Sequence, residues 1–254
     1  MSTLWLVFPA YNEEKNLKTL LPELDRFIRE KIRDYKILII NDGSSDATKD
    51  IAKCLDRVLP ISVISHETNK GVGEVFKTAF SSIAKMAGPD DLVIVLEADG
   101  TSDYTLIPEI AQKLRDGNDI IIASRYIKGG SYKNFPLKRH MISLVGNIIL
   151  RFAIGNKKIK DYTIFYRGYK AGLIKEALTK YKDGFITSKT FLANTEMLGN
   201  LTRLTDKISE IPFVYSYDRK IGKSKMPLMR TLVDYIKFLI VKQIGNRVSE
   251  SFKK

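Results

Sequence analysis

Two carboxylates that follow an apolar run are the strongest chemical feature of this sequence. Residues 92–104 read LVIVLEADGTSDY, and the apolar run 92–96 ends at Glu97 and Asp99. Carboxylates at positions i and i+2 beyond a strand can converge on one divalent cation, because Mg²⁺ and Mn²⁺ take oxygen ligands and leave positions for phosphate oxygens. The alternative explanation is two solvated acids at a strand end, so the surrounding residues must decide.

Two further polar loops follow apolar runs. Pro9 fixes the backbone before Tyr11 and Glu13, an aromatic ring and an acceptor carboxylate that together could hold a nucleobase. Asp42 follows the run 36–40, where a carboxylate can accept hydrogen bonds from a ribose or a base. A strand-to-helix turn for the first loop and a helix cap for Asp42 are the ordinary alternatives.

Residues 69–73, NKGVG, place two glycines at the start of an expected helix. The segment lacks the GK[ST] of a Walker loop and the third glycine of a dinucleotide-binding loop. Close packing of a strand against a helix therefore explains the glycines better than phosphate binding does.

Four basic residues are candidate phosphate ligands: Arg125, Arg139, Arg219 and Lys225. Arginine presents a fork that matches phosphate oxygens, and lysine presents a mobile point charge. Surface solvation is the default explanation for any one of them. The segment 218–225, DRKIGKSK, holds four cations beside one glycine and suits a diphosphate or a lipid phosphate.

Apolar and amphipathic segments alternate through the first half of the chain. Strands are expected at 4–8, 36–40, 61–65, 92–96 and 120–123. Helices are expected at 14–33, at 47–59, from the glycines of 69–73 to about 86, and at 104–116. This α/β alternation predicts a mostly parallel, twisted sheet with helices on both faces. Ligands of such sheets bind beyond the carboxyl ends of the strands, so the loops 9–14, 41–46, 66–73 and 97–101 should surround one crevice.

The second half of the chain is less regular. We expect helices at 138–154, 171–181, 188–200 and 228–244, a short strand within 155–170 and a strand at 208–214. Ser143, Asn147 and Arg151 form one polar stripe on the first of these helices. The helix 228–244 has an apolar face and basic neighbours, so it could rest on an anionic bilayer or pack on the core.

The formal net charge of the 254 residues is +13, and it is concentrated in two blocks. Residues 122–170 carry 11 basic residues and one acidic residue, and residues 219–254 carry 10 and 2. Such blocks suit nucleic acid, an acidic membrane surface or a phosphorylated substrate. Nucleic acid is not expected, because no recognised binding motif is present and the basic residues follow the candidate phosphate loops.

The scarcity of cysteine and histidine excludes several kinds of site. The single Cys54 rules out an internal disulfide and a cysteine metal cluster, and it fits a reducing compartment. His66 and His140 are the only histidines, which argues against a histidine-rich metal site or a Ser-His-Asp triad. No signal peptide is visible and no apolar run is long enough to span a bilayer.

Taken together, eight segments resemble glycosyltransferase family 2 of GT-A fold, and within it the polyprenyl-phosphate sugar transferases typified by dolichol-phosphate mannose synthase. They are FPAYNEEKNL, IINDGSSDAT, NKGVGEVFKTAF, VLEADGT, ASRYIKGG, RHMISLVGNIILR, DYTIFYRGY and EIPFVYSYDRKIGKSKM. The resemblance implies a GT-A domain at 1–226, with a nucleotide-sugar half at 1–123 and an acceptor half at 124–226. An amphipathic helix and basic tail follow at 227–254.

The resemblance also implies residue roles. Nucleotide-sugar binding would involve Pro9, Tyr11, Glu13, Asp42, Lys70, Glu97, Ala98 and Asp99. Glu97 and Asp99 would bind the divalent cation, Mg²⁺ or Mn²⁺, although the family usually has aspartate at the first position. The acceptor phosphate would face Arg125, Arg139 and Asn147. Catalysis would depend on Asp99, Arg125, Arg219 and Lys225.

The implied reaction is an inverting, metal-dependent transfer of a hexosyl group from a GDP-mannose or UDP-glucose type of donor to a polyprenyl or dolichyl phosphate. The lipid phosphate is already anionic at neutral pH, so no strong general base is required. Such a protein would be cytoplasmic and peripheral on the cytoplasmic face of a membrane. The sequence leaves its oligomeric state open.

Two alternatives remain at this point. One is transfer to a saccharide or another hydroxyl, for which Asp103 or Glu196 could act as the base. The QxxRW segment of processive saccharide-extending relatives is missing, and the only tryptophan is Trp5. The other alternative is a non-catalytic module that binds a nucleotide sugar or a membrane.

Overall fold

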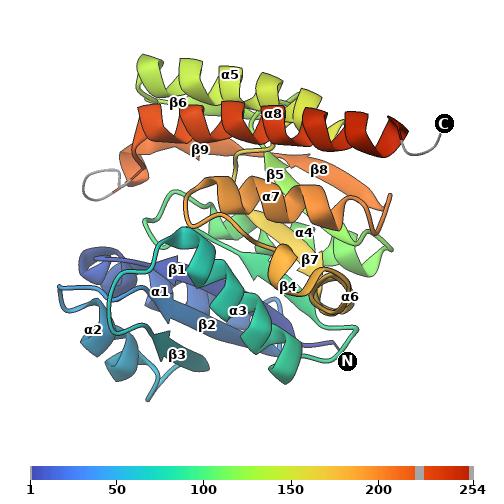
Figure 1. Ribbon diagram of the computed structural model, residues 1–254. Helices are drawn as coiled ribbons and strands as arrows, with labels where there is room; N and C mark the ends of the chain where they lie inside the picture. The colour runs from blue at the N-terminus through green and yellow to red at the C-terminus, as the bar shows by residue number, and fades with distance from the viewer. Residues whose placement is uncertain (1, 221–225, 252–254) are drawn as a thin grey trace.

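The computed structural model describes residues 2–220 and 226–251, with side chains in the last helix described as far as residue 241 (Figure 1). Its main feature is a seven-stranded sheet with the strand order β3-β2-β1-β4-β7-β5-β8. The strands are β1 (Leu4–Ala10), β2 (Tyr35–Asn41), β3 (Ile61–Ser65), β4 (Leu92–Val95), β5 (Ile120–Ser124), β7 (Arg167–Lys170) and β8 (Ile208–Pro212). Among these strands only β7 runs antiparallel to its neighbours, so the expected mostly parallel sheet is confirmed.

Helices cover both faces of this sheet, as expected. They are α1 (Glu14–Arg29), α2 (Thr48–Leu55), α3 (Val72–Met86), α4 (Ile107–Arg115), α6 (Ala171–Tyr181) and α7 (Leu192–Leu201). Two successive residues of β7 show that both faces of the sheet are covered, because the side chains of neighbouring residues point to opposite sides of a strand. The ring of Tyr169 meets Phe80 of α3, whereas Gly168 lies against α4. Figure 1 shows α3, α6 and α7 together in front of the sheet.

The strand expected at 208–214 is two strands in the structure. β8 ends at Pro212, and β9 (Val214–Ser216) pairs instead with β6 (Ser131–Lys133) in a separate two-stranded ribbon. Pro212 has no backbone N–H and cannot continue a hydrogen-bonded ladder. The chain therefore leaves the main sheet here, and the ribbon brings the residues that follow it back toward the carboxylates of the β4 loop.

Two long helices, α5 (Leu137–Ile154) and α8 (Leu228–Ser251), lie side by side at one end of the molecule (Figure 1). α8 buries Thr231 and Tyr235 against the rest of the protein. Packing on the core, the alternative that the sequence left open for this helix, is therefore correct for one of its faces. None of the helices in the described ranges is long and apolar enough to cross a bilayer.

A substitution at Gly168 would test the packing of β7 against α4 in the middle of the sheet. A Cβ at this residue would lie 2.4 Å from Ile110 and 3.0 Å from Leu114 of α4. We expect Gly168→Ala to lower the free energy of unfolding by about 1–3 kcal/mol, because the side chains of a packed core cannot yield that far without strain. Urea denaturation followed by circular dichroism would measure the change. Gly184→Ala is the matched control, since a Cβ there would meet nothing within 4 Å; equal stabilities of the two variants would contradict the packing described.

Candidate functional site

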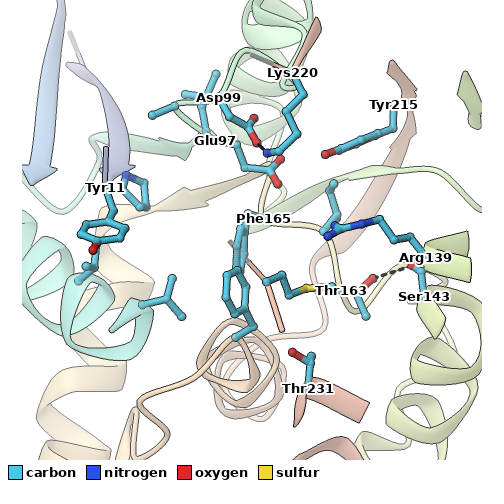
Figure 2. A pocket seen from close by; sticks show the side chains of 18 of the residues that line it. Tyr11, Glu97, Asp99, Arg139, Ser143, Thr163, Phe165, Tyr215, Lys220 and Thr231 are labelled. Carbon is cyan, nitrogen blue, oxygen red and sulfur yellow. Dashed lines mark hydrogen bonds and ion pairs between the residues drawn. The ribbon is translucent and has the colours of Figure 1, made fainter. Parts of the chain in front are cut away.

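A cavity of about 450 Å³ opens beyond the carboxyl ends of the parallel strands (Figure 2). Its lining combines the loops that follow β1, β2, β3 and β4 with residues from α3, α5, α8 and β9, and with Phe191, which precedes α7. The sequence-based expectation that these four loops surround one crevice is therefore confirmed. Nine of the predicted site residues line it: Pro9, Tyr11, Glu13, Asp42, Glu97, Ala98, Asp99, Arg125 and Arg139.

The two carboxylates of the β4 loop point into this cavity (Figure 2). Gly100 takes a φ of 79°, a left-handed conformation that turns the chain directly after Asp99. The backbone N–H and the hydroxyl of Thr101 then donate to Oδ1 of Asp99, at 3.1 and 2.6 Å. Ser102 accepts from the backbone N–H of Glu97 at 3.1 Å and donates to its carboxylate at 3.3 Å. The tight turn thus fixes both acids before any ligand arrives.

Lys220 forms an ion pair with Oδ2 of Asp99 inside the cavity (Figure 2). The side chains of both residues are only 12% exposed. Burial raises the pKa of Glu97 above its usual value, and the positive charges of Lys220 and Arg125 oppose that effect only in part. Lys220 was not among the predicted site residues. The only signal for it in the sequence was the density of cations in the segment 218–225.

The carboxylate pair fits a divalent cation that is shared with a phosphorylated substrate. Mg²⁺ typically binds proteins through one or two carboxylates and completes its shell with water and substrate phosphates. Nowhere in the described ranges do three or more His, Cys, Asp or Glu residues form a cluster that could hold a metal alone. Glu97 and Asp99 would supply two oxygen ligands, and a diphosphate would supply others.

Asp42 is held rigidly at the edge of the cavity. Its carboxylate accepts hydrogen bonds from the backbone N–H groups of Lys70 and Gly71, each at 2.9 Å. His66 contacts the same carboxylate through Nδ1 at 2.7 Å, and its Nε2 lies 2.9 Å from the hydroxyl of Thr78. Lys70 thus positions Asp42 through its backbone N–H. Its side chain is exposed and does not line the cavity.

The two glycines at the start of α3 serve close packing, as the sequence favoured, but against a loop rather than a strand. A Cβ at Gly73 would lie 1.9 Å from the carbonyl oxygen of Ser188, and Gly71 approaches Lys189 in the same way. Glu196 fixes this loop by accepting from the backbone N–H groups of Thr187 and Ser188 at 2.8 and 2.9 Å. The backbone at Gly73 is therefore covered by protein, whereas Gly71 and Val72 line the cavity.

Arg125 is buried beside the cavity and paired with Asp161. Its Nε and Nη2 each lie 2.7 Å from the Asp161 carboxylate, and Nη2 also donates to Thr163 at 2.7 Å. The guanidinium lies 5.1 Å from the centre of the Tyr132 ring and 5.9 Å from that of Tyr215. Its orientation is thus fixed by the protein, with its positive charge close to the carboxylate pair.

The remaining predicted residues lie elsewhere. Asn147 does not line the cavity; its amide donates to the carbonyl oxygen of Ser143 at 2.8 Å and accepts from the backbone N–H of Tyr162 at 2.6 Å. It fixes the segment beside Thr163, which does line the cavity. Arg219 is half exposed and lies 3.4 Å from Asp103, outside the lining. Lys225 lies outside the described residues.

Sequence reasoning missed the apolar part of the cavity. Ile142 of α5, Tyr235 of α8, Met226 and the ring of Phe191 contribute to it. The ring of Phe165 points into the same part (Figure 2). These residues come from distant segments without a shared motif, so their spacing carried no signal. The cavity therefore combines a charged floor with an apolar side next to α5 and α8.

The buried pair of Arg125 and Asp161 predicts a pH-dependent stability. Burial alone would raise the pKa of Asp161, but the charge and hydrogen bonds of Arg125 outweigh it and hold that pKa below its usual value. We expect Asp161→Asn to cost about 3 kcal/mol of unfolding free energy at pH 7, because it leaves a buried charge without its partner.

The sign of the pH effect follows from the lowered pKa. The stabilisation from Asp161 is fully present above its unfolded pKa of about 3.9 and is lost as pH falls through the lower folded value. The difference between wild type and Asp161→Asn should therefore be constant above about pH 5 and shrink below about pH 4. Urea denaturation across this range measures it, with the exposed Asp183→Asn as the control. A difference that grows on acidification would refute the assignment.

Comparison with known proteins supports the family resemblance. Residues 5–181 match the family model described as Glycosyl transferase family 2. The chain is 29% identical to a dolichol-phosphate mannosyltransferase of Pyrococcus furiosus, over 92% of this chain and 62% of the relative. It is 29% identical to an undecaprenyl-phosphate mannosyltransferase of Micrococcus luteus, over 87% of this chain and 86% of the relative. The chain thus spans less than two thirds of the length of the Pyrococcus protein.

Solved structures agree on the fold. Glucosyl-3-phosphoglycerate synthase from Mycobacterium tuberculosis, solved in complex with Mn²⁺, UDP and glucosyl-3-phosphoglycerate, superposes with a TM-score of 0.64 over 95% of this chain and 80% of that one. The sequence identity of 16% limits this likeness to the fold. The match of the family model over most of the chain shows the family itself: this protein belongs to glycosyl transferase family 2 and has the GT-A fold.

Proposed function

We propose that this protein transfers a hexosyl group, with inversion and with a divalent cation, from a nucleotide sugar to a polyprenyl or dolichyl phosphate. The observation that carries the proposal is the cavity itself, which joins a buried carboxylate pair, fixed cations and an apolar side. The names of the Pyrococcus and Micrococcus relatives, and of a polyprenol monophosphomannose synthase of Mycolicibacterium smegmatis that is 27% identical over 87% of this chain, favour a mannosyl donor of the GDP-mannose type over UDP-glucose.

The donor would lie along the loops that follow the parallel strands. Tyr11, Glu13 and Asp42 would hold the nucleoside, since a ring and two acceptors line the cavity there. Glu97 and Asp99 would hold Mg²⁺ or Mn²⁺, which neutralises the charge of the diphosphate as it leaves. Ala98 lies between them in the lining and leaves room for the phosphates. The hexose would then lie between this edge and the basic side of the cavity.

The acceptor phosphate would lie near Arg125 and Arg139, both of which line the cavity from the α5 side. An anionic phosphate oxygen needs no general base, only positive charge to hold it close to the anionic donor. Asn147 would act through Thr163 rather than by direct contact, and Arg219 through its position beside Lys220. The apolar side formed by Ile142, Phe165 and Tyr235 would accommodate the first isoprene units.

The structure gives the hydroxyl-acceptor alternative little support. Asp103 accepts from Thr105 at 3.1 and 2.6 Å and pairs with Arg219, and it does not line the cavity. Glu196 is engaged with the loop beside α3 and is also absent from the lining. Neither of the two candidate bases therefore faces the place where an acceptor hydroxyl would react.

The proposal predicts label transfer into a lipid product that depends on Asp99. Purified protein would meet labelled GDP-mannose or UDP-glucose with a polyprenyl phosphate and Mn²⁺, and label would be counted in the organic phase. We expect activity that EDTA abolishes and that Asp99→Asn lowers by roughly 100-fold or more, because it removes an anionic ligand from the cation and diphosphate. The exposed Glu109→Gln on α4 is the control and should keep full activity.

Two results would overturn this assignment. Transfer that persists in EDTA or in Asp99→Asn would reject the metal site. Folded protein that binds GDP-mannose or UDP-glucose but transfers label to no lipid phosphate would favour a binding module.

We also propose that the face formed by α5 and α8 rests on an anionic membrane. Exposed apolar side chains follow one stripe on each helix: Leu137, Met141, Leu144, Val145, Ile148 and Phe152 on α5, and Met229, Val233, Ile236, Ile240 and Val241 on α8. Up to residue 241, the two helices carry five basic residues and one acid. Apolar stripes with basic neighbours are typical of helices that lie in a membrane interface.

Vesicle binding tests this face. Phe152 is 74% exposed, so Phe152→Glu should leave the fold intact while it places a negative charge on the membrane side. We expect it to weaken co-sedimentation with phosphatidylglycerol vesicles at least several-fold, since an apolar contact and charge attraction are both lost. The control is Val58→Glu, which changes an equally exposed apolar residue after α2. Equal binding of the two variants would reject the α5–α8 face.

A further inference from the structure

Lys220 occupies the oxygen of Asp99 that a cation would use. Oδ1 of Asp99 already accepts two hydrogen bonds from Thr101, so Oδ2 is the oxygen left for an ionic ligand. The ammonium of Lys220 lies against this Oδ2 (Figure 2). A protein cation therefore sits at the position expected for a metal ligand bond.

The contact between Lys220 and Asp99 is largely shielded from solvent, so the electrostatic interaction between the two groups is strong. Both side chains are 12% exposed, and screening by water is weak at such a site. Arg125 lies nearby, but its Nε and Nη2 are bonded to Asp161 and Thr163, and the cation that contacts Asp99 is Lys220. A divalent cation bound at Oδ2 would stand within a few ångströms of the ammonium, and two positive charges at that distance repel strongly. Both cannot share this oxygen.

We propose that Lys220 is a resident counter-ion of the Glu97–Asp99 pair, and that a divalent cation binds by displacing its ammonium from Asp99. The proposal rests on the proposed function of this site, because it concerns the same cation. It makes Lys220 a residue that sets cation affinity. No bond other than ionic contacts is made or broken: the ammonium leaves one carboxylate oxygen as the cation takes it.

The displacement also links the cation to the nucleotide. The diphosphate of a nucleotide bound in this cavity would offer the displaced ammonium an anionic contact. The cation should therefore bind weakly alone and much more tightly together with the nucleotide, a coupling that must act equally in both directions. Lys220 thereby favours the ternary complex over a site that holds the metal alone.

The predicted effects of Lys220→Met have opposite signs for the two ligands. Methionine has a similar length and no charge, so Mn²⁺ alone should bind at least about tenfold more tightly once competition at Asp99 is gone. GDP or UDP, tested separately at saturating Mn²⁺, should bind more weakly because the ammonium no longer contacts the diphosphate. A merely structural role would loosen the site and weaken both ligands.

The measurement is titration of the full-length protein with Mn²⁺, followed by the electron paramagnetic resonance signal of the free ion. Lys220→Arg should behave close to wild type, since it keeps the charge. Lys133→Met, a change of an exposed lysine on β6, controls for the loss of one positive charge from the molecule. Circular dichroism verifies that each variant is folded.

Asp99→Asn distinguishes a failure of this inference from a failure of the metal site. If Asp99→Asn weakens Mn²⁺ binding and Lys220→Met leaves it unchanged or weaker, the counter-ion role is wrong and the metal site stands. If Asp99→Asn has no effect in either background, the cation site itself is wrong, and the counter-ion role with it. Tighter Mn²⁺ binding in Lys220→Met and unchanged binding in Lys133→Met would support the proposal.

Discussion

The compensation of buried charge around Asp99 is the constraint on which the rest of this site depends. Two carboxylates lie two residues apart at the end of a buried strand, and the loss of hydration there raises the pKa of Glu97. Lys220 compensates this negative charge by direct contact with Asp99, and Arg125 compensates part of it from a greater distance. A site that already holds opposite charges in a poorly hydrated place can stabilise a leaving diphosphate without much reorganisation.

The fold supplies the rigidity that this arrangement needs. Arg167 of β7 is fully buried and donates to the Asn194 side chain at 2.9 Å and to the carbonyl oxygen of Tyr162 at 2.8 Å. Asn147 fixes the same segment from α5. The antiparallel strand therefore anchors residues 162–165 at the cavity wall, where Thr163 in turn orients Arg125. A short strand in the middle of the sheet thus connects core packing to the cavity wall beside Arg125.

Sequence reasoning succeeded where a local pattern determines the structure. The first five parallel strands read as apolar runs, and the rule that ligands bind beyond their carboxyl ends located Asp42, Glu97 and Asp99 in the cavity.

Sequence reasoning failed where contacts join distant residues. Lys220 pairs with a residue 121 positions away, and neither its type nor its neighbours distinguish it from three other cations in its loop. β7 is four residues long, too short for periodicity to show its place in the sheet. The exposed stripe of α5 was not predicted, because the apolar residues of a helix do not show by themselves whether they face the core or the surface.

We propose Glu97 and Asp99 as the place where a divalent cation and a nucleoside diphosphate meet. The most direct test is a crystal grown with Mn²⁺ and GDP and measured at the manganese absorption edge. We expect one strong anomalous peak within about 2.0–2.3 Å of oxygens from both carboxylates and the diphosphate, with the Lys220 ammonium moved away from Asp99. A diphosphate bound in the cavity with no peak beside these two residues would contradict it.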